Sequence, residues 1–315
     1  MLRFGAIAFA LAAAAFSAEA RAGGVAIGVP AWPSAAVTAH IISQTLNDRL
    51  GVETELSERG TMTILSDIGR GGLQIHPEVW LPNLAGMVDR LGKENVLRLA
   101  PHGVAATQAI CATRQTLEQT GIGSVTDLTK PEIAAQFDSD GDGNGEMWIG
   151  APTWSSTEIE KIRARSYGYD RTMTLLEAPE DVAMAAVDAA ASLGRPIVFF
   201  CYSPHHVFQL HDIATLEEPP HDPARWTIVK RAEDADWLEK SRADTAWDAS
   251  RFHVAYAASL ETSLPDVVSF LDAIAFTPAD ITAMSYAVQV DGRPADEVAR
   301  KWIADNQDRI GEWTK

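Results

Sequence analysis

The sequence is poor in cysteine and in basic side chains. Of its 315 residues only two are Cys, and 26 Lys and Arg stand against 43 Asp and Glu, which gives a formal net charge of -17 at pH 7. Two Cys cannot build the dense disulfide framework of a small secreted scaffold. The shortage of Lys and Arg argues against nucleic acid or an anionic membrane as partner, because phosphate groups are bound by clustered basic side chains.

Long hydrophobic runs are also missing, apart from one at the N-terminus. No later segment approaches the ~20 apolar residues that a transmembrane helix needs. At the N-terminus, Arg3 precedes an apolar run from Phe4 to Phe16 and the small-x-small motif Ala20-Arg-Ala22. This pattern is typical of a cleaved secretory signal peptide over residues 1–22, with an apolar core helix as the alternative. We therefore expect an exported, unanchored protein.

The two cysteines lie in apolar, strand-like segments, Ala109-Ile-Cys111-Ala and Val198-Phe-Phe-Cys201-Tyr. In an oxidising compartment they can form one disulfide, and two buried free thiols are the alternative. Neither Cys has a His or Lys close in sequence to lower its pKa, so the sequence does not support a catalytic thiol.

Strand-like and helix-like segments alternate along most of the chain, which indicates an α/β fold with mostly parallel sheets covered by helices. Apolar strand patterns cover residues 24–29, 52–56, 73–80, 104–113, 147–151, 173–177, 196–202 and 252–258, and helical spacing covers 34–50, 62–69, 84–91, 155–167, 179–193, 265–275, 279–288 and 295–309. Two such series separated by the long strand 104–113 predict two lobes. Residues 23–103 and 213–315 are assigned to a discontinuous lobe 1, and residues 104–212 to lobe 2.

Four aromatic residues share one local pattern. Each falls just past the carboxyl end of a predicted strand, and a Pro or Ser that signals a turn or helix start follows at once or, for Trp80, after Leu81: Trp32, Trp80, Trp154 and Tyr202. In an α/β sheet this edge forms the ligand crevice, so the four rings are expected to line one site. Ring faces can hold a quaternary ammonium group, which has no hydrogen bond to donate, at ~0.5–2 kcal/mol per desolvated ring. For any single ring, packing of a helix onto the sheet is the alternative interpretation.

Polar residues beside these rings complete the predicted site. The run Ser155-Ser156-Thr157-Glu158 fits a capping box, and free backbone N–H groups at such a helix start favour a small anion. Glu78 precedes Trp80 by two residues, where a carboxylate attracts a cation; an exposed loop Glu is the alternative. His205 is interpreted as polar lining. The other six Trp are assigned to packing: Trp148, Trp226, Trp237, Trp247, Trp302 and Trp313.

Side-chain oxygens alternate along one acidic loop, at Asp138, Asp140, Asp142, Asn144 and Glu146. With Gly143 at position 6, the loop matches the first part of a calcium-binding loop, but Ile149 stands at position 12 in place of the bidentate Glu. We expect a structural Ca²⁺ here, with a solvated Asp/Gly turn as the alternative.

Catalytic motifs are missing. The chain has no H-E-x-x-H, no G-x-S-x-G and no Cys/His zinc spacing. Ser203 with His205 can be imagined as a hydrolase pair, and His205-His206 with Glu78 or Asp212 as a metal site. We expect neither enzymatic activity nor a catalytic cofactor, and keep an exported hydrolase and a calcium-dependent scaffold module as alternatives.

Four segments, taken in order, resemble the glycine betaine/proline betaine substrate-binding proteins of ABC importers. They are Gly28-Val-Pro-Ala-Trp32-Pro-Ser, His76-Pro-Glu-Val-Trp80-Leu-Pro, Phe137-Asp-Ser-Asp-Gly-Asp-Gly and Gly150-Ala-Pro-Thr-Trp154. The resemblance implies a two-lobed periplasmic binding protein fold of type II, each lobe a mostly parallel sheet flanked by helices, with two crossover strands as hinge. The family's three-Trp cage matches Trp80, Trp154 and Tyr202, with Tyr where Trp is common, and Trp32 resembles an added wall in a related subgroup.

These observations combine into one hypothesis. The protein is expected to bind a small methylated ammonium zwitterion in the periplasm and to deliver it, as a monomer, to an ABC permease in the inner membrane. Glycine betaine is the first choice; trimethylamine N-oxide, choline, proline betaine and dimethylsulfoniopropionate are the alternatives. The backbone amides of Ser155, Ser156 and Thr157 are expected to hold an anionic tail.

Overall fold

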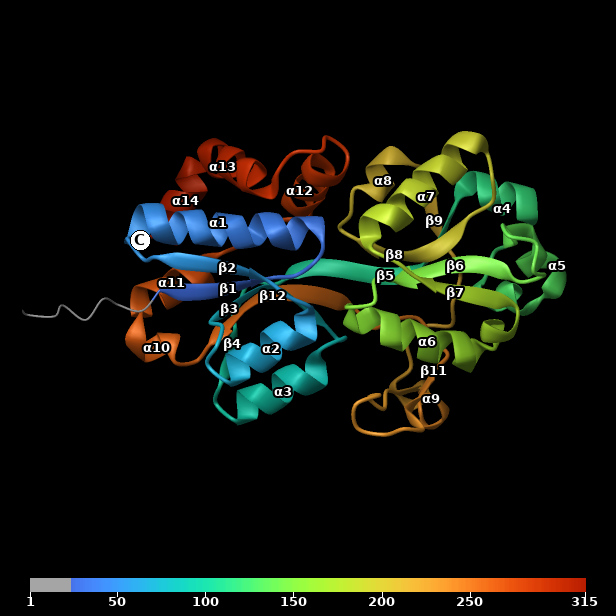
Figure 1. The fold of residues 1–315 in the computed structure, drawn as a ribbon, viewed down its shortest axis with the longest axis horizontal. Helices are drawn as coiled ribbons and strands as arrows, with labels where there is room; N and C mark the ends of the chain where they lie inside the picture. Colours follow the sequence, from blue (N-terminus) through green and yellow to red (C-terminus); the bar gives the residue numbers. More distant parts are fainter. Residues whose placement is uncertain (1–23) are drawn as a thin grey trace, which may run out of the picture.

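The computed structural model describes residues 24–315, and the predicted signal peptide lies outside them. Two groups of helices surround one continuous sheet (Figure 1). The first half contains β1 (Val25–Val29), α1 (Pro33–Leu50), β2 (Thr54–Glu58), α2 (Thr61–Gly69), β3 (Ile75–Leu81), α3 (Ala85–Lys93), β4 (Leu97–Leu99), β12 (Ser250–Ala257), α10 (Leu260–Ser263), α11 (Pro265–Ala273), α12 (Pro278–Gln289), α13 (Ala295–Asp305) and α14 (Gln307–Trp313).

The second half begins at the long strand β5. It contains β5 (Val104–Thr113), α4 (Arg114–Thr120), α5 (Pro131–Ala134), β6 (Gly145–Gly150), α6 (Ser155–Tyr167), β7 (Met173–Glu177), α7 (Glu180–Leu193), β8 (Val198–Ser203), α8 (Val207–Leu210), β9 (Ile213–Thr215), β10 (Trp226–Thr227), α9 (Trp237–Lys240) and β11 (Arg242–Ala243). Short 3₁₀ turns lie at Val125–Thr129, Ala135–Phe137, Tyr169–Arg171 and Pro223–Arg225.

The sheet runs in the order β2-β1-β3-β12-β5-β8-β6-β7. The neighbours β2-β1-β3 and β8-β6-β7 are parallel, as the alternating pattern predicts, while β12 and β5 run antiparallel to their neighbours. Strand β5 pairs first with β12, from Val104 to Ala106, and then with β8, from Thr107 to Ala112. The two crossing strands therefore join the halves, and the carboxyl ends of both parallel sets face the junction.

Close packing of helices on the strands depends on two glycines that matter for the site. A Cβ on Gly28 of β1 would lie 2.6 Å from Ile64 of α2, so only Gly lets α2 approach this strand. Gly150 ends β6 with φ +125°, a conformation that favours glycine, and a Cβ there would meet Thr157 Oγ1 at 2.4 Å. The first glycine positions the start of α2, and the second positions the turn into α6.

The segment from β9 to β11 packs on the second half, which moves the predicted boundary at residue 213. Strand β9 pairs with β5, and β11 contacts α6. Arg163 of α6, fully buried, anchors this segment through its Nη2 to Glu218 Oε2 (2.5 Å), while Glu160 Oε1 accepts from the Trp247 indole N–H (2.7 Å). Residues 213–249 show little hydrophobic periodicity, so their long-range ion pair could not be predicted from the sequence.

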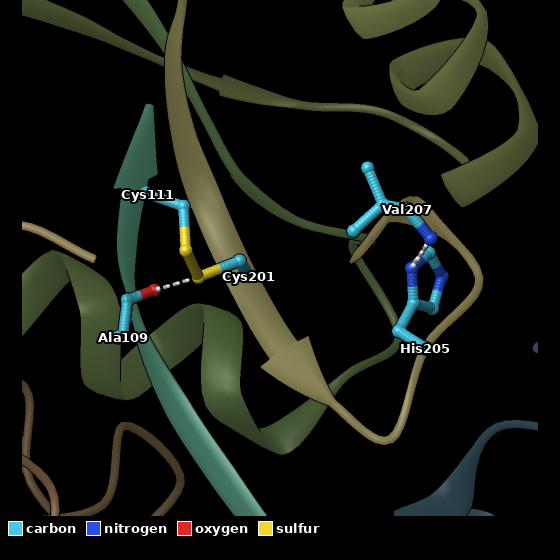
Figure 2. Close-up of a disulfide and its surroundings, with 5 residues drawn as sticks. All are labelled: Ala109, Cys111, Cys201, His205 and Val207. Carbon is cyan, nitrogen blue, oxygen red and sulfur yellow. Dashed lines mark hydrogen bonds between the residues drawn. A yellow bond between two sulfur atoms is a disulfide. The ribbon is translucent and has the colours of Figure 1, made fainter. Parts of the chain in front are cut away.

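The two cysteines form a disulfide in the structure. Cys111 of β5 and Cys201 of β8 are joined with their Cα atoms 5.7 Å apart (Figure 2). The bond cross-links neighbouring antiparallel strands at a point where they are already paired, since Cys111 lies opposite Phe199 and Cys201 opposite Ala109. It belongs entirely to the second half.

Most predicted elements match the structure, and one does not. The predictions for 104–113, 155–167 and 173–177 have the bounds of β5, α6 and β7. The single helix predicted over 295–309 is wrong, because Asn306 leaves helical geometry (φ -120°, ψ 34°) and separates α13 from α14. The break lets Trp302 and Trp313 stack at 5.6 Å, so both rings pack the C-terminal helices as expected.

No single helix among residues 24–315 is long and apolar enough to cross a membrane; α11 and α12 reach that length only together, across a 95° bend.

Candidate functional site

A small pocket lies where the two halves meet. Its cavity volume is about 40 Å³. None of its lining residues is charged: they are Trp32, Thr61, Trp80, Asn83, Leu84, Gln108, Trp154, Ser155, Ser156, Phe200 and Tyr202. The pocket thus collects all four aromatic residues that the sequence singled out, and both halves contribute to it.

The four rings form a chain of three nearly perpendicular contacts at the pocket. Trp154 meets Trp32 at a centroid distance of 6.2 Å (84° between planes) and Tyr202 at 5.7 Å (79°), and Tyr202 meets Trp80 at 5.3 Å (82°). Trp32 and Trp154 are the N-cap residues of α1 and α6, whereas Trp80 and Tyr202 are the penultimate residues of β3 and β8. Several ring faces around one small space can attract a cation that lies within about 6 Å of their centroids.

The wall from the first half is fixed by a buried carboxyl. Glu78 is fully buried, so its interpretation as an exposed loop residue is excluded. Its Oε2 accepts from the Trp32 indole N–H (2.7 Å) and from Ser34 Oγ (3.2 Å), and its Oε1 accepts from Thr38 Oγ1 (3.4 Å). Burial raises the pKa of Glu78 to about 7, although these three bonds lower it. Glu78 therefore orients a ring of the site and does not line the pocket.

The wall from the second half is tied to a different carboxyl, which the sequence analysis missed. The Tyr202 hydroxyl donates to Oε1 of Glu180, the first residue of α7, and His205 Nε2 lies 3.0 Å from the same oxygen. Burial, followed by the nearby Glu180 charge, raises the pKa of Tyr202 well above its ordinary value, so the hydroxyl keeps its proton. His205 is buried behind Tyr202, with ring centroids 4.7 Å apart, and is absent from the pocket lining.

The start of α6 presents uncapped backbone amides to the pocket. The predicted capping box is wrong, since Trp154 is the N-cap residue, Ser155 is the first helical residue and no side chain caps the helix. Ser155 and Ser156 line the pocket, whereas the Thr157 hydroxyl bonds back to the Ala151 carbonyl (2.6 Å). The Trp154 indole N–H is also buried without a hydrogen-bond partner. Around Trp154 the described part of the chain therefore leaves pocket donors that no side chain satisfies.

Sequence reasoning missed the amide cluster at the floor of the pocket. Asn83 and Gln108 bond reciprocally through their side-chain amides (2.7 and 2.9 Å), and Gln108 Nε2 also contacts Ser250 Oγ at 2.9 Å. These residues come from the β3–α3 turn and from both crossing strands, β5 and β12. A lone Gln inside the apolar strand 104–113 was the signal that could have found this cluster.

The acidic loop brings four carboxylates together. Ligand oxygens of Asp138, Asp140, Asp142 and Glu146 all lie within 4.8 Å of one another, and Glu146 Oε1 is buried without a partner. Asn144 lies in the same loop, and its backbone N–H donates to Asp142 Oδ1. Ile149 is buried in the core and cannot act as the twelfth-position ligand.

The alternative catalytic arrangements do not assemble. His205 turns Nε2 to Glu180, and its Nδ1 accepts from the Val207 N–H at 3.2 Å (Figure 2), so neither ring nitrogen activates Ser203. His206 Nδ1 bonds Ser285 Oγ at 2.7 Å, and Asp212 pairs with Arg114. The hydrolase pair and the His-based metal site are therefore unsupported by the geometry.

This fold and pocket define a two-lobed binding protein of the type II periplasmic class. Among solved structures, the chain is similar to lactococcal OpuAC in its closed form with glycine betaine (TM-score 0.70, 19% identity, covering 93% of this chain and 99% of that one). It is also similar to an ABC-transporter choline-binding protein in complex with choline (TM-score 0.72, 16% identity, covering 92% and 91%).

Residues 23–305 match the family described as the substrate binding domain of ABC-type glycine betaine transport system, and the chain belongs to that family. A trimethylamine N-oxide-binding protein of Pelagibacter ubique is 23% identical over 90% of this chain and 88% of its own length. The glycine betaine/proline betaine-binding periplasmic protein of Salmonella typhimurium is 19% identical over 67% of this chain, and the match spans 64% of that relative. The resemblance seen in the sequence is thereby confirmed.

Proposed function

We propose that this protein binds a small methylated ammonium zwitterion between its two halves and hands it to an ABC permease in the inner membrane. The observation that carries the proposal is the box of Trp32, Trp80, Trp154 and Tyr202 around an uncharged pocket. Four desolvated rings at ~0.5–2 kcal/mol each give several kcal/mol, enough for micromolar affinity after the cost of immobilising the ligand. Glycine betaine is our first choice of ligand.

The polar tail of the ligand is assigned to the start of α6. Backbone N–H groups at a helix N-terminus stabilise an anion, and those of Ser155 and Ser156 are uncapped at the pocket. The buried, unpartnered Trp154 indole N–H supplies a further donor. A carboxylate, an N-oxide oxygen or a hydroxyl can accept from these groups, which is why trimethylamine N-oxide, choline, proline betaine and dimethylsulfoniopropionate stay in the set of candidates.

We propose the location and the mechanism on the same basis. Relatives are named as periplasmic binding proteins, and the N-terminal pattern favours export, so we assign the protein to the periplasm. The two halves, joined by β5 and β12, would close on the ligand as two lobes. We expect a monomer that performs no chemistry on its cargo.

Titration calorimetry tests the proposal. Purified protein is titrated with glycine betaine, trimethylamine N-oxide, choline, proline betaine and dimethylsulfoniopropionate, and with glycine as the unmethylated control. We expect micromolar binding of at least one methylated ligand and none of glycine, because glycine loses its ammonium hydration without gaining methyl contacts with the rings. Absence of heat with the whole panel would overturn the proposed function.

We further propose that the acidic loop holds a structural Ca²⁺ through Asp138, Asp140, Asp142 and Glu146. The donor set fits a hard cation, since it consists of carboxylate oxygens within 4.8 Å of one another and includes an unpartnered buried oxygen of Glu146. The ion would neutralise the repulsion among these groups. Thermal unfolding in Ca²⁺ and in chelator should differ for the wild type and coincide for Asp138→Asn; equal melting temperatures in the wild type would contradict the site.

A further inference from the structure

The pocket poses an electrostatic problem, because it is proposed to hold a cation and yet no charged side chain lines it. Buried carboxyls stand behind its walls instead. Glu78 lies behind Trp32, with three hydrogen-bond donors shared over both oxygens. Glu180 lies behind Tyr202, with two donors on one oxygen and none on the other. The second carboxyl is the less neutralised of the two.

The hydrogen bonds around Glu180 show that it acts as an acceptor only. The Val207 N–H donates to Nδ1 of His205, so the neutral imidazole carries its proton on Nε2 and donates it to Glu180 Oε1. The Tyr202 hydroxyl is the second donor to the same oxygen. Glu180 is also the first residue of the 14-residue helix α7, whose N-terminus stabilises a negative charge. Glu180 thus accepts two hydrogen bonds on one oxygen at a helix start, an environment that stabilises negative charge.

The position of Tyr202 couples this carboxylate to the pocket. Its ring lines the pocket between Trp80 and Trp154, while its hydroxyl points away to Glu180. A phenol that donates a hydrogen bond to an anion gains electron density on its ring, which strengthens its attraction for a cation. Little solvent screens the carboxylate, since Glu180 is only 4% exposed. A Trp ring at this position would have no hydroxyl to make this bond.

We propose that Glu180, acting through the Tyr202 hydroxyl and without touching the ligand, makes the pocket selective for a positively charged nitrogen over an uncharged group of the same shape. The inference rests on the proposed function and deepens it. Glu180 is a positioning residue for the cation and His205 supports it by fixing the orientation of the carboxylate. The Tyr202 hydroxyl is then the group that couples this carboxyl to the cage.

The test compares two ligands of equal shape. Glycine betaine carries a trimethylammonium group, and 3,3-dimethylbutanoate has a carbon atom in place of the charged nitrogen. Dissociation constants are measured for the wild type, Glu180→Gln and Tyr202→Phe by calorimetry and, for the weaker isostere, by saturation-transfer NMR. The carboxamide of Gln still accepts from Tyr202 and His205 but carries no charge, and Phe keeps the ring while losing the hydroxyl.

We expect each variant to raise the dissociation constant of glycine betaine about tenfold and that of the isostere less than twofold. Only glycine betaine has a cationic nitrogen that the Glu180 carboxylate can attract. Equal weakening of both ligands, or unchanged binding of glycine betaine, overturns the inference. Choline with 3,3-dimethylbutan-1-ol replaces the pair if the wild type prefers choline. A wild type that binds no methylated ligand would overturn both the proposed function and this inference. A wild type that binds glycine betaine, with variants that keep its full preference over the isostere, would overturn the inference alone.

The chain offers a matched control for both substitutions. The Tyr256 hydroxyl donates to Asp272 Oδ1 at 3.0 Å in the first half, and neither residue lines the pocket. Tyr256→Phe and Asp272→Asn therefore remove the same kind of bond elsewhere and should leave both dissociation constants unchanged. Thermal unfolding of every variant shows whether it folds. If Glu180→Gln does not fold, the dissociation constants of Tyr202→Phe test the inference.

Discussion

The two walls of the pocket are built from the same kinds of residues. They differ in which buried hydrogen-bonding groups have no partner. Each half supplies two rings and one buried carboxyl: Trp32, Trp80 and Glu78 from the first, and Trp154, Tyr202 and Glu180 from the second. In the first wall the carboxyl is bonded by donors of its own half. In the second wall, among the residues that the structure describes, the Trp154 indole N–H and one oxygen of Glu180 have no partner. The Trp32 indole and the Glu78 carboxyl of the first wall are bonded without ligand, whereas the second wall keeps the Trp154 indole N–H free for a ligand.

Removing a ring from the second wall should have the largest effect. Trp154 contacts Trp32, Trp148 and Tyr202, and it is the N-cap residue of α6. We expect Trp154→Ala to abolish detectable binding, a loss of at least about 100-fold or roughly 2.7 kcal/mol, while the fold stays intact. Calorimetry with glycine betaine measures the loss, and circular dichroism checks the fold.

Trp237→Ala is the control for this substitution, because Trp237 lies in α9 and outside the pocket. Its affinity should equal that of the wild type. If Trp154→Ala itself bound glycine betaine with unchanged affinity, Trp154 would have only a packing role. The proposed difference between the two walls would then be wrong.

The second prediction concerns stability, since only the second half carries the disulfide. Cys111 and Cys201 are separated by 90 residues, so cross-linking them restricts the unfolded chain strongly. Replacing both by Ala should lower the free energy of unfolding by about 2–4 kcal/mol, measured by urea denaturation, with affinity within twofold. Reductant should destabilise the wild type and leave the double variant unchanged; a reductant effect on both would show that the disulfide is not its target.

The third prediction concerns the first wall, where Glu78 should make the free energy of unfolding depend on pH. Burial raises the pKa of Glu78 from 4.5 to about 7, so between these values the folded protein binds a proton that the unfolded chain has released. Stability due to Glu78 therefore falls as pH rises from about 4.5 to 7, by about 3 kcal/mol in total, and is constant above. His76, whose pKa burial lowers to about 3, stays neutral throughout this window.

The measurement is the difference in unfolding free energy between the wild type and Glu78→Gln across that pH range. This difference cancels other groups that titrate in the same range, such as Glu160, whose pKa burial also raises to about 7. A difference that is flat with pH would mean that the Glu78 carboxyl is as well solvated in the folded protein as in the unfolded one.

Much of the fold was readable from the sequence, and the site only in part. Periodicity located β5, α6 and β7 because each is a local pattern, and all four cage rings were found from their place after strands. Glu180 and Gln108 were missed because their importance comes from partners 22 and 25 residues away, Tyr202 and Asn83. A single sequence shows which side chains stand at a strand end, but not which buried polar groups meet across the fold.

The smallest predicted effect on affinity concerns a hydrogen bond between the two halves outside the pocket. We assign this bond to closure of the halves. His206, next to the second wall, bonds Ser285 Oγ of α12 in the first half at 2.7 Å, and both residues are buried. Burial lowers the pKa of His206 to about 3, so the neutral imidazole makes this bond at physiological pH.

Removing this bond should favour the open form without touching the cage. We expect Ser285→Ala to weaken affinity for glycine betaine about fivefold, in line with the ~1 kcal/mol of one hydrogen bond, mainly through faster dissociation in stopped-flow measurements. Ser269→Ala in α11 is the matched control, since the Ser269 hydroxyl bonds only to Pro265 of its own helix. If both variants released ligand at the wild-type rate, closure would be held by the ligand and the two walls alone, and the comparison between the walls would account for the whole affinity.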